Sequence, residues 1–138
     1  MKYIGLDLGS VTCGISRSDT GKLAQAVKTL RFKRDDYNDA MDRLEEFLET
    51  EQPDIIILGY PLLENGDEGP RAQLSKDFGR VLQEETGIPV YLQDERCTTK
   101  DSEEFLISAD VSRKKRKKII DQQAAVRILQ YWLDKQEK

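Results

Sequence analysis

The chain has 138 residues, of which 38% are hydrophobic, 35% are charged and none is histidine. This length fits one domain with a buried core, and the longest aliphatic run, Ile55 to Leu58, is too short to span a membrane. The absence of histidine excludes Ser-His-Asp and Cys-His hydrolysis and His-ligated zinc catalysis. Acid–base chemistry would therefore have to come from carboxylates, lysines, tyrosines or a metal-bound water.

Cysteine content and the first residues indicate where the protein works. Cys13 and Cys97 are too few and too far apart for a disulfide framework or a zinc cluster. The first residues run directly into a strand-like segment, a shape that no secretory signal has. We therefore expect a cytoplasmic protein that does not associate with membranes.

The charge is unevenly distributed along the chain. The formal net charge of −4 argues mildly against a nucleic-acid partner. Six consecutive basic residues argue the other way, because such a block can bind a polyanion locally; a solvated charge run is the alternative interpretation. The six are Arg113, Lys114, Lys115, Arg116, Lys117 and Lys118.

The first half of the chain predicts three strands, a helix and a buried strand. Segments 3–8, 13–18 and 24–32 are strand-like and separated by turn signals, which predicts antiparallel hairpins. Apolar residues then recur at helical spacing from Tyr37 to Leu48, with Asp35 or Asp36 placed to cap the helix. The aliphatic run that follows is typical of a central strand covered on both faces.

The second half predicts alternating helices and strands. A helix is expected around Leu74 to Leu82, a fifth strand over 88–92, a short helix capped by Thr98 or Thr99, and a last helix that opens at Asp121. The order βββ-α-β-α-β-α-α predicts an α/β domain with a mixed five-stranded sheet and helices on both faces. No repeat or linker divides residues 1–138, so we expect a single domain.

Three acidic sites differ from the many acidic residues expected on helix surfaces. Asp7 lies inside the first strand, where an unpaired carboxylate would cost several kcal/mol. Asp94 and Glu95 follow the fifth strand, at the edge where α/β sheets bind ligands, and Asp121 opens the last helix. Each has a structural alternative: a turn cap for Asp7, an ion pair between Asp94 and Arg96, and a helix N-cap for Asp121.

Together, the carboxylates of Asp7, of Asp94 or Glu95, and of Asp121 predict a metal site. Carboxylates from two strand ends and a helix start can meet around one or two Mg²⁺ or Mn²⁺ ions, which prefer oxygen ligands. Two such ions about 3.5–4 Å apart activate a water molecule and stabilise the transition state of phosphodiester hydrolysis. The hypothesis is a metal-dependent nuclease that needs no imidazole base.

Four segments spread over nearly the whole chain resemble the YqgF family, also called RuvX, of ribonuclease H-like proteins. This family is distantly similar to the Holliday-junction resolvase RuvC. The matching segments begin with Gly5-Leu6-Asp7-Leu8-Gly9-Ser10, Gly59-Tyr60-Pro61-Leu62, Asp94-Glu95-Arg96-Cys97-Thr98-Thr99 and Ile120-Asp121.

The resemblance implies a ribonuclease H-like fold and a nuclease with Asp7, Glu95 and Asp121 as catalytic and metal-binding residues. It also implies maturation of the 5′ end of pre-16S ribosomal RNA during ribosome biogenesis. The alternative within the same chemistry is resolution of Holliday junctions in branched DNA. We expect a monomer or a weak homodimer with precursor rRNA as its partner.

Residues near the three carboxylates are expected to contact the substrate. Ser10 and Thr12 could donate hydrogen bonds to phosphates beside Asp7, and Arg96 could contact a phosphate or hold Asp94. The basic run from Arg113 to Lys118 could clamp the strand before Asp121 and make binding steeply dependent on salt.

Two other classes of function remain open. The hairpin Asp7-Leu8-Gly9-Ser10 followed by Gly14 also resembles the phosphate-binding hairpin of actin-like ATPases and sugar kinases. Those proteins generally enclose ATP between two such domains, whereas this chain supplies one. The other class is a non-catalytic nucleic-acid-binding factor in transcription or ribosome assembly.

Overall fold

A computed structural model describes residues 1–95 and 113–136, with side chains described over 1–95 and 123–136. Five strands form one sheet in the order β3-β2-β1-β4-β5. β2 is antiparallel to β1 and β3, whereas β1, β4 and β5 are mutually parallel, so the predicted mixed sheet is confirmed. The strands are β1 (Tyr3–Leu8), β2 (Thr12–Ser18), β3 (Gln25–Arg31), β4 (Ile55–Tyr60) and β5 (Val90–Asp94).

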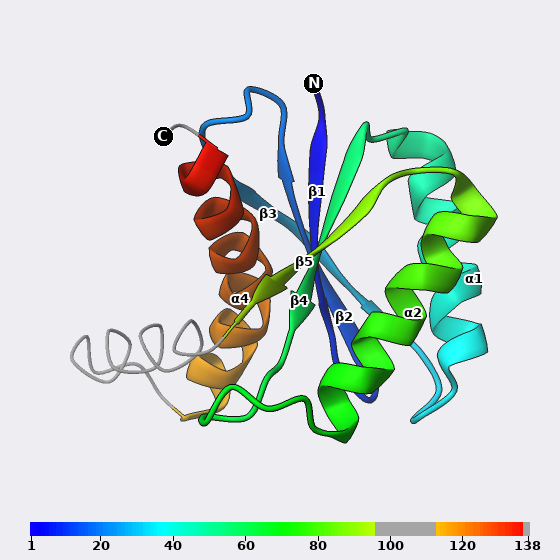
Figure 1. The fold of residues 1–138 in the computed structure, drawn as a ribbon, viewed down its shortest axis with the longest axis vertical. Coiled ribbons are helices and arrows are strands. Elements are labelled where there is room, and N and C mark those ends of the chain that lie inside the picture. Colours follow the sequence, from blue (N-terminus) through cyan, green and yellow to red (C-terminus); the bar gives the residue numbers. More distant parts are fainter. Residues whose placement is uncertain (96–112, 137–138) are drawn as a thin grey trace.

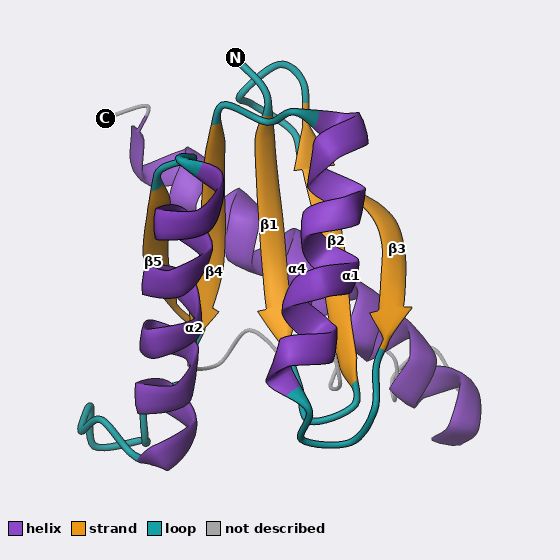
Figure 2. Ribbon diagram, turned by 90° about the vertical axis from the view of Figure 1, so that its right-hand side faces the viewer, coloured by secondary structure: helices purple, strands orange, loops and turns teal. Residues whose placement is uncertain are grey.

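Helices cover both faces of the sheet, as predicted. Figures 1 and 2 show α1 (Tyr37–Glu51) and α2 (Pro70–Thr86) on one face and α4 (Arg113–Gln136) on the other. The expected short helix after Thr98 and Thr99 lies outside the described residues. Within the described part of the chain, no helix is both long enough and apolar enough to cross a membrane.

Local sequence sets the ends of α1 and α2. The side chain of Asp36 accepts a hydrogen bond from the backbone N–H of Asp39 at 3.0 Å, so Asp36 is the cap of α1. Pro70 occupies the first turn of α2, where its missing N–H is no loss. Gly87 ends α2 with φ at 73°, a conformation that glycine adopts without strain.

β4 is buried on both faces, as its aliphatic sequence predicts. Ile56 and Leu58 are fully buried in the core beneath α1 and α2. Ile57 points the other way and is fully buried with Ile128 and Leu129 of α4. This alternation fixes which side of the sheet each neighbouring residue faces.

The last helix begins at Arg113, so the prediction that it opens at Asp121 is wrong. The prediction followed the apolar periodicity, which starts only after the basic run. Lysine and arginine are themselves good helix formers, and the helix therefore continues through Arg113–Lys118. Asp121 is consequently inside α4 and not at its N-cap.

The ends of four strands define the edge of the sheet that carries the candidate site. β1, β4 and β5 are parallel, and β3 runs in the same direction as β1 because both are antiparallel to β2. All four therefore end at the lower end of the molecule in Figures 1 and 2. We call this the carboxyl edge; the opposite edge is where β1 begins.

Candidate active site

Asp7 is the penultimate residue of β1 and lies close to the carboxyl edge. Leu6 and Leu8 on either side of it are buried in the core beneath α1 and α2. Because side chains alternate along a strand, Asp7 faces the opposite side of the sheet, which α4 covers. Its side chain is partly buried.

Glu95 directly follows β5 and lies on the same face of the sheet. Its backbone N–H donates to the carbonyl of Tyr60 at 3.4 Å. A Cβ added to Gly59 on β4 would collide with the Glu95 carboxylate and would lie 2.7 Å from Cδ1 of Ile128 in α4. The Glu95 carboxylate therefore lies against Gly59, on the α4 side.

Strand register brings Asp7 and Glu95 together. Leu6 of β1 pairs with Leu58 of β4, so Asp7 and Gly59 are the next residues along these neighbouring strands. Adjacent strands are about 4.8 Å apart, and Glu95 lies against Gly59. Asp7 and Glu95 are 88 positions apart in the sequence, and the pairing of the strands brings them close together in space.

The electrostatics of Glu95 reflect this arrangement. The pKa of Glu95 is raised to about 8, first by burial and then by the negative charges of Asp7 and Asp94, against the opposing effect of the positive charge of Arg71. Neighbouring carboxylates that resist joint ionisation in this way are stabilised by a cation. The pair is therefore electrostatically suited to a divalent metal ion.

The structure describes Asp94 with its side chain, but for Asp121 it describes only the backbone. Asp94 is the last residue of β5, opposite Tyr60 of β4, and its charge contributes to the raised pKa of Glu95. Asp121 lies in α4 one turn before Ala125, which is fully buried against the sheet. The side chain of Asp121 lies outside the described residues, so its approach to Asp7 stays a prediction.

The donor set fits a hard divalent cation, although the described part of it is incomplete. Among the residues that the structure describes, no group of three or more His, Cys, Asp or Glu side chains is arranged to hold a metal ion. Asp7 and Glu95 supply carboxylate oxygens, which Mg²⁺ and Mn²⁺ prefer. The side chain of Asp121, the third predicted ligand, is not among the described residues.

Cys13 lies beside Asp7 but is unsuited to nucleophilic chemistry. The thiol is buried on β2, opposite Leu8 of β1. Burial raises the pKa of Cys13 far above its ordinary value, and the negative charge of Asp7 raises it further. The thiol therefore stays protonated, and a thiolate is the reactive form of cysteine.

Arg71 is a basic residue near the carboxylates that the sequence analysis missed. It lies in the first turn of α2, and its guanidinium donates to the carbonyl of Leu8 at 3.2 Å and to the hydroxyl of Tyr37 at 2.9 Å. Its charge acts on Glu95. Its position in the sequence could have revealed it, because Arg71 follows Pro70 at the start of a helix. Helix starts in α/β proteins lie at the edge of the sheet where ligands bind.

The predicted substrate contacts are only partly described. Ser10 is in the turn between β1 and β2, Thr12 is the first residue of β2, and both are partly buried near the carboxyl edge. Arg96 lies outside the described residues. The run Arg113–Lys118 forms the first turns of α4, at the lower end of the molecule in Figures 1 and 2.

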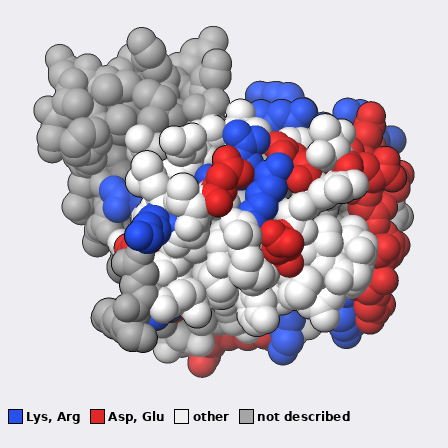
Figure 3. All heavy atoms as spheres, turned by 90° about the horizontal axis from the view of Figure 1, so that it is seen from above, with Lys and Arg blue, Asp and Glu red and all other residues white. Residues whose placement is uncertain are grey.

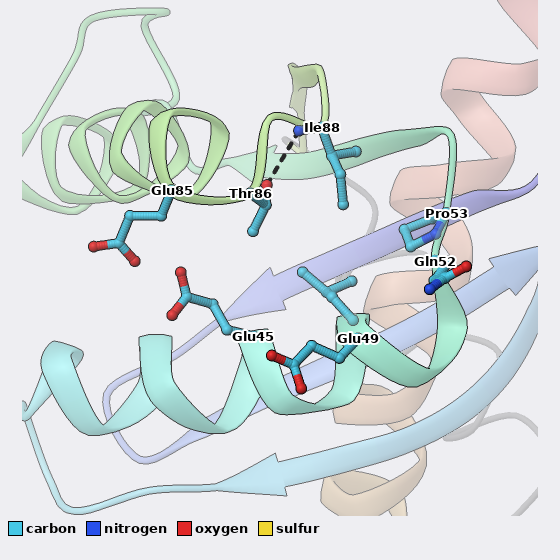
Figure 4. A pocket seen from close by; sticks show the side chains of 8 residues that line it. Glu45, Glu49, Gln52, Pro53, Glu85, Thr86 and Ile88 are labelled. Carbon is cyan, nitrogen blue, oxygen red and sulfur yellow. Dashed lines mark hydrogen bonds between the residues drawn. The ribbon is translucent and has the colours of Figure 1, made fainter.

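A cavity of about 460 Å³ lies away from the carboxylates, between the C-terminal parts of α1 and α2. Figure 4 shows Glu45 and Glu85 turned toward each other across it, with Glu49 nearby. The hydrogen bond with Glu85, followed by burial and neighbouring negative charges, raises the pKa of Glu45 to about 7. This acidic lining is unsuited to a polyanionic substrate.

Comparison with known proteins identifies relatives of the whole chain. Residues 1–135 match the family model of RuvX, which is described as Holliday junction resolvase. A Bacillus subtilis protein named "Putative pre-16S rRNA nuclease" is 45% identical over 135 residues, which cover 97% of this chain and 98% of that protein.

Solved structures agree on the fold. Thermus thermophilus RuvC in complex with a Holliday junction substrate matches with a TM-score of 0.65 and 14% identity, covering 99% of this chain and 96% of RuvC. A hexokinase of the ROK type from Thermus thermophilus matches with a TM-score of 0.51 and 25% identity but is covered over only 38% of its length. The ribonuclease H-like fold is confirmed, and the match over residues 1–135 shows that the chain belongs to the RuvX family.

Proposed function

We propose that the chain is a metal-dependent nuclease that hydrolyses phosphodiester bonds in the 5′-end maturation of pre-16S rRNA in the cytoplasm. The observation that supports this most is the approach of Asp7 and Glu95 on one face of the sheet, where the pKa of Glu95 is raised to about 8. The name of the Bacillus subtilis relative supplies the substrate.

The metal ligands in this proposal are Asp7, Glu95 and Asp121, with Asp94 as the alternative to Glu95. α4 lies on the face to which Asp7 and Glu95 point, so Asp121 belongs to the element nearest them. Two Mg²⁺ or Mn²⁺ ions bound there lower the pKa of a water and neutralise charge that develops on the leaving oxygen.

Basic and hydroxyl-bearing residues hold the substrate in this proposal. Arg96 and the run Arg113–Lys118 contact the phosphate backbone, and Ser10 and Thr12 donate hydrogen bonds beside Asp7. The basic run forms the start of α4 and therefore reaches the same end of the molecule as the strand ends.

Resolution of branched DNA is the second candidate, favoured by the description of the family model. It requires a symmetric dimer, because two sites must act on opposite strands of a junction. Light scattering at micromolar concentration separates the candidates: a monomer argues against resolution, whereas a stable dimer favours it over our first proposal.

The deciding experiment incubates labelled precursor 16S rRNA and a four-way DNA junction in parallel with Mg²⁺ or Mn²⁺. We expect wild type to cleave the precursor, and Asp7→Asn to lose cleavage by at least about 100-fold while binding RNA in Ca²⁺, since a ligand is removed without a change in shape. Asp42→Asn, on the exposed surface of α1, is the matched control.

Two outcomes would contradict the proposal. Cleavage at the wild-type rate by Asp7→Asn would reject the site. RNA binding by wild type without cleavage in either metal would favour a non-catalytic binding factor.

A further inference from the structure

A short turn between β3 and α1, which carries Lys33 and Arg34, is fixed against the turn between β1 and β2. The backbone N–H of Phe32 donates to Val11 at 2.9 Å, and that of Asp35 donates to Ser10 at 2.8 Å. Phe32 itself is 7% exposed and anchors the segment in the core. The two residues between these anchors, Lys33 and Arg34, are exposed.

Arg71 is joined to the same turn through a chain of hydrogen bonds. Its guanidinium donates to Leu8 at 3.2 Å and to the hydroxyl of Tyr37 at 2.9 Å, and this hydroxyl donates to the Asp35 carboxylate at 3.4 Å. The start of α2, the start of α1 and the end of β1 are thereby connected. We call Lys33, Arg34 and Arg71 the basic shelf.

The basic shelf lies at the carboxyl edge, beside the candidate metal ligands. β3 ends two strand positions from β1, which corresponds to about 10 Å, and both views place these ends together at the lower end of the molecule (Figures 1 and 2). The charge of Arg71 reaches Glu95. The N-termini of α1 and α2 lie at the same edge and add partial positive charge.

Neither Lys33 nor Arg34 forms an ion pair within the described part of the chain, where no carboxylate lies within 4 Å of either charged group. The nearby carboxylates are held by backbone and side-chain donors. Asp36 caps α1, and Asp39 pairs with Arg43 at 3.1 Å and accepts a hydrogen bond from the backbone N–H of Lys33 at 2.9 Å. The side chains of Lys33 and Arg34 are exposed and are not held in ion pairs.

Two basic residues at the opposite edge are held in ion pairs. Figure 3 looks onto that end, where basic and acidic side chains adjoin. Lys2 and Arg17 are both paired with Glu51, at 2.6 and 2.8 Å. Lys33 and Arg34, which lie at the edge that carries Asp7 and Glu95, differ from these two residues in having no such ion pair.

We propose that the basic shelf binds the sugar-phosphate backbone of the nucleic acid on the α1 and α2 side of the scissile bond. This inference rests on the proposed nuclease function. A strand whose phosphate reaches Asp7 continues past the end of β1, where the shelf supplies described basic side chains on the α1 and α2 side. Guanidinium and ammonium groups suit phosphate oxygens, and each phosphate neutralised releases counterions.

The test measures binding of fluorescein-labelled single-stranded RNA in Ca²⁺, by anisotropy, over a range of salt concentrations. For Lys33→Gln/Arg34→Gln we expect a Kd weaker on the order of tenfold and a slope of log K against log salt reduced by about 1.4, or about 0.7 for each lost phosphate contact. Arg71→Gln should reduce the slope by about 0.7.

The matched control is Lys22→Gln/Arg80→Gln, which removes two exposed positive charges away from the carboxyl edge. It should keep the wild-type slope and Kd. The inference is overturned if the shelf double variant, folded by circular dichroism, binds like this control, or if wild type binds no RNA. Failure of the nuclease proposal looks different: RNA binding and its salt slope persist, but no phosphodiester bond is cleaved in Mg²⁺ or Mn²⁺.

Discussion

Gly59 has no side chain at the point where the carboxylate of Glu95 lies against β4. The glycine is required by this close approach, because a single added carbon would meet both Glu95 and Ile128. Burial of Glu95 at this point raises its pKa, and the charge of Asp7 acts on the same carboxylate. Gly59 thereby leaves the space in which the Glu95 carboxylate lies near Asp7.

Gly59→Ala should therefore displace Glu95. We expect a loss of about 1–3 kcal/mol in unfolding free energy from overpacking and a fall in Mn²⁺ affinity of about 10-fold or more. Urea unfolding and calorimetric titration with Mn²⁺ measure the two effects.

Gly79→Ala is the control for steric crowding that does not displace the metal ligand Glu95. A Cβ at Gly79 would lie 3.0 Å from Leu58 and 3.3 Å from Val90, on the face of the sheet away from the carboxylates. This control should lose stability but keep its Mn²⁺ affinity. Equal Mn²⁺ affinity in Gly59→Ala and wild type would contradict the role given to Gly59.

Sequence reasoning selected Asp7 and Glu95 as candidates but missed the residues that adjoin them in the fold. Their approach could be expected because a charge within or just after an aliphatic strand is unusual. The roles of Gly59 and Arg71 could not be expected, because they depend on contacts between distant parts of the chain: Gly59 meets Glu95, and Arg71 meets Leu8. No local pattern encodes such contacts.

The elements themselves were predictable where burial is periodic. β1 has the predicted bounds, and β4 is covered on both faces as its aliphatic run indicates. The start of α4 was missed, because its first turns contain the basic run and carry no apolar periodicity. The first turns of α4 form because lysine and arginine favour the helical conformation, and not because the segment has an amphipathic pattern.

α1 and α2 face each other through Glu45 and Glu85, and this contact should make stability depend on pH. The pKa of Glu45 is raised from 4.5 to about 7, first by its hydrogen bond with Glu85. The folded protein therefore binds more protons than the unfolded chain between these pH values. The unfolding free energy should fall as the pH rises from about 4.5 to about 7.

Glu45→Gln should reduce this pH dependence, since the amide cannot ionise. Urea unfolding at pH 5, 6, 7 and 8 measures it, with Glu46→Gln on the same helix as the control for loss of one negative charge. If Glu45→Gln and wild type lose stability equally over this range, Glu45 is not the group responsible.

The whole molecule is organised around one edge of its sheet. Four strands end there, α1 and α2 begin there, and Asp7, Glu95 and the basic shelf lie there. The acidic cavity around Glu45 lies away from this edge, between the C-terminal parts of α1 and α2. A chain with a net charge of −4 can thus offer a polyanion a cationic approach to a metal site.

Binding of Mn²⁺, followed by calorimetry or electron paramagnetic resonance, tests most directly whether these carboxylates converge on divalent ions. We expect wild type to bind Mn²⁺, and Asp7→Asn, Glu95→Gln and Asp121→Asn each to weaken binding by about 10- to 100-fold. The surface variant Asp42→Asn should bind as wild type does. Unchanged Mn²⁺ affinity in the three carboxylate variants would contradict the shared metal site on which the proposed nuclease activity depends.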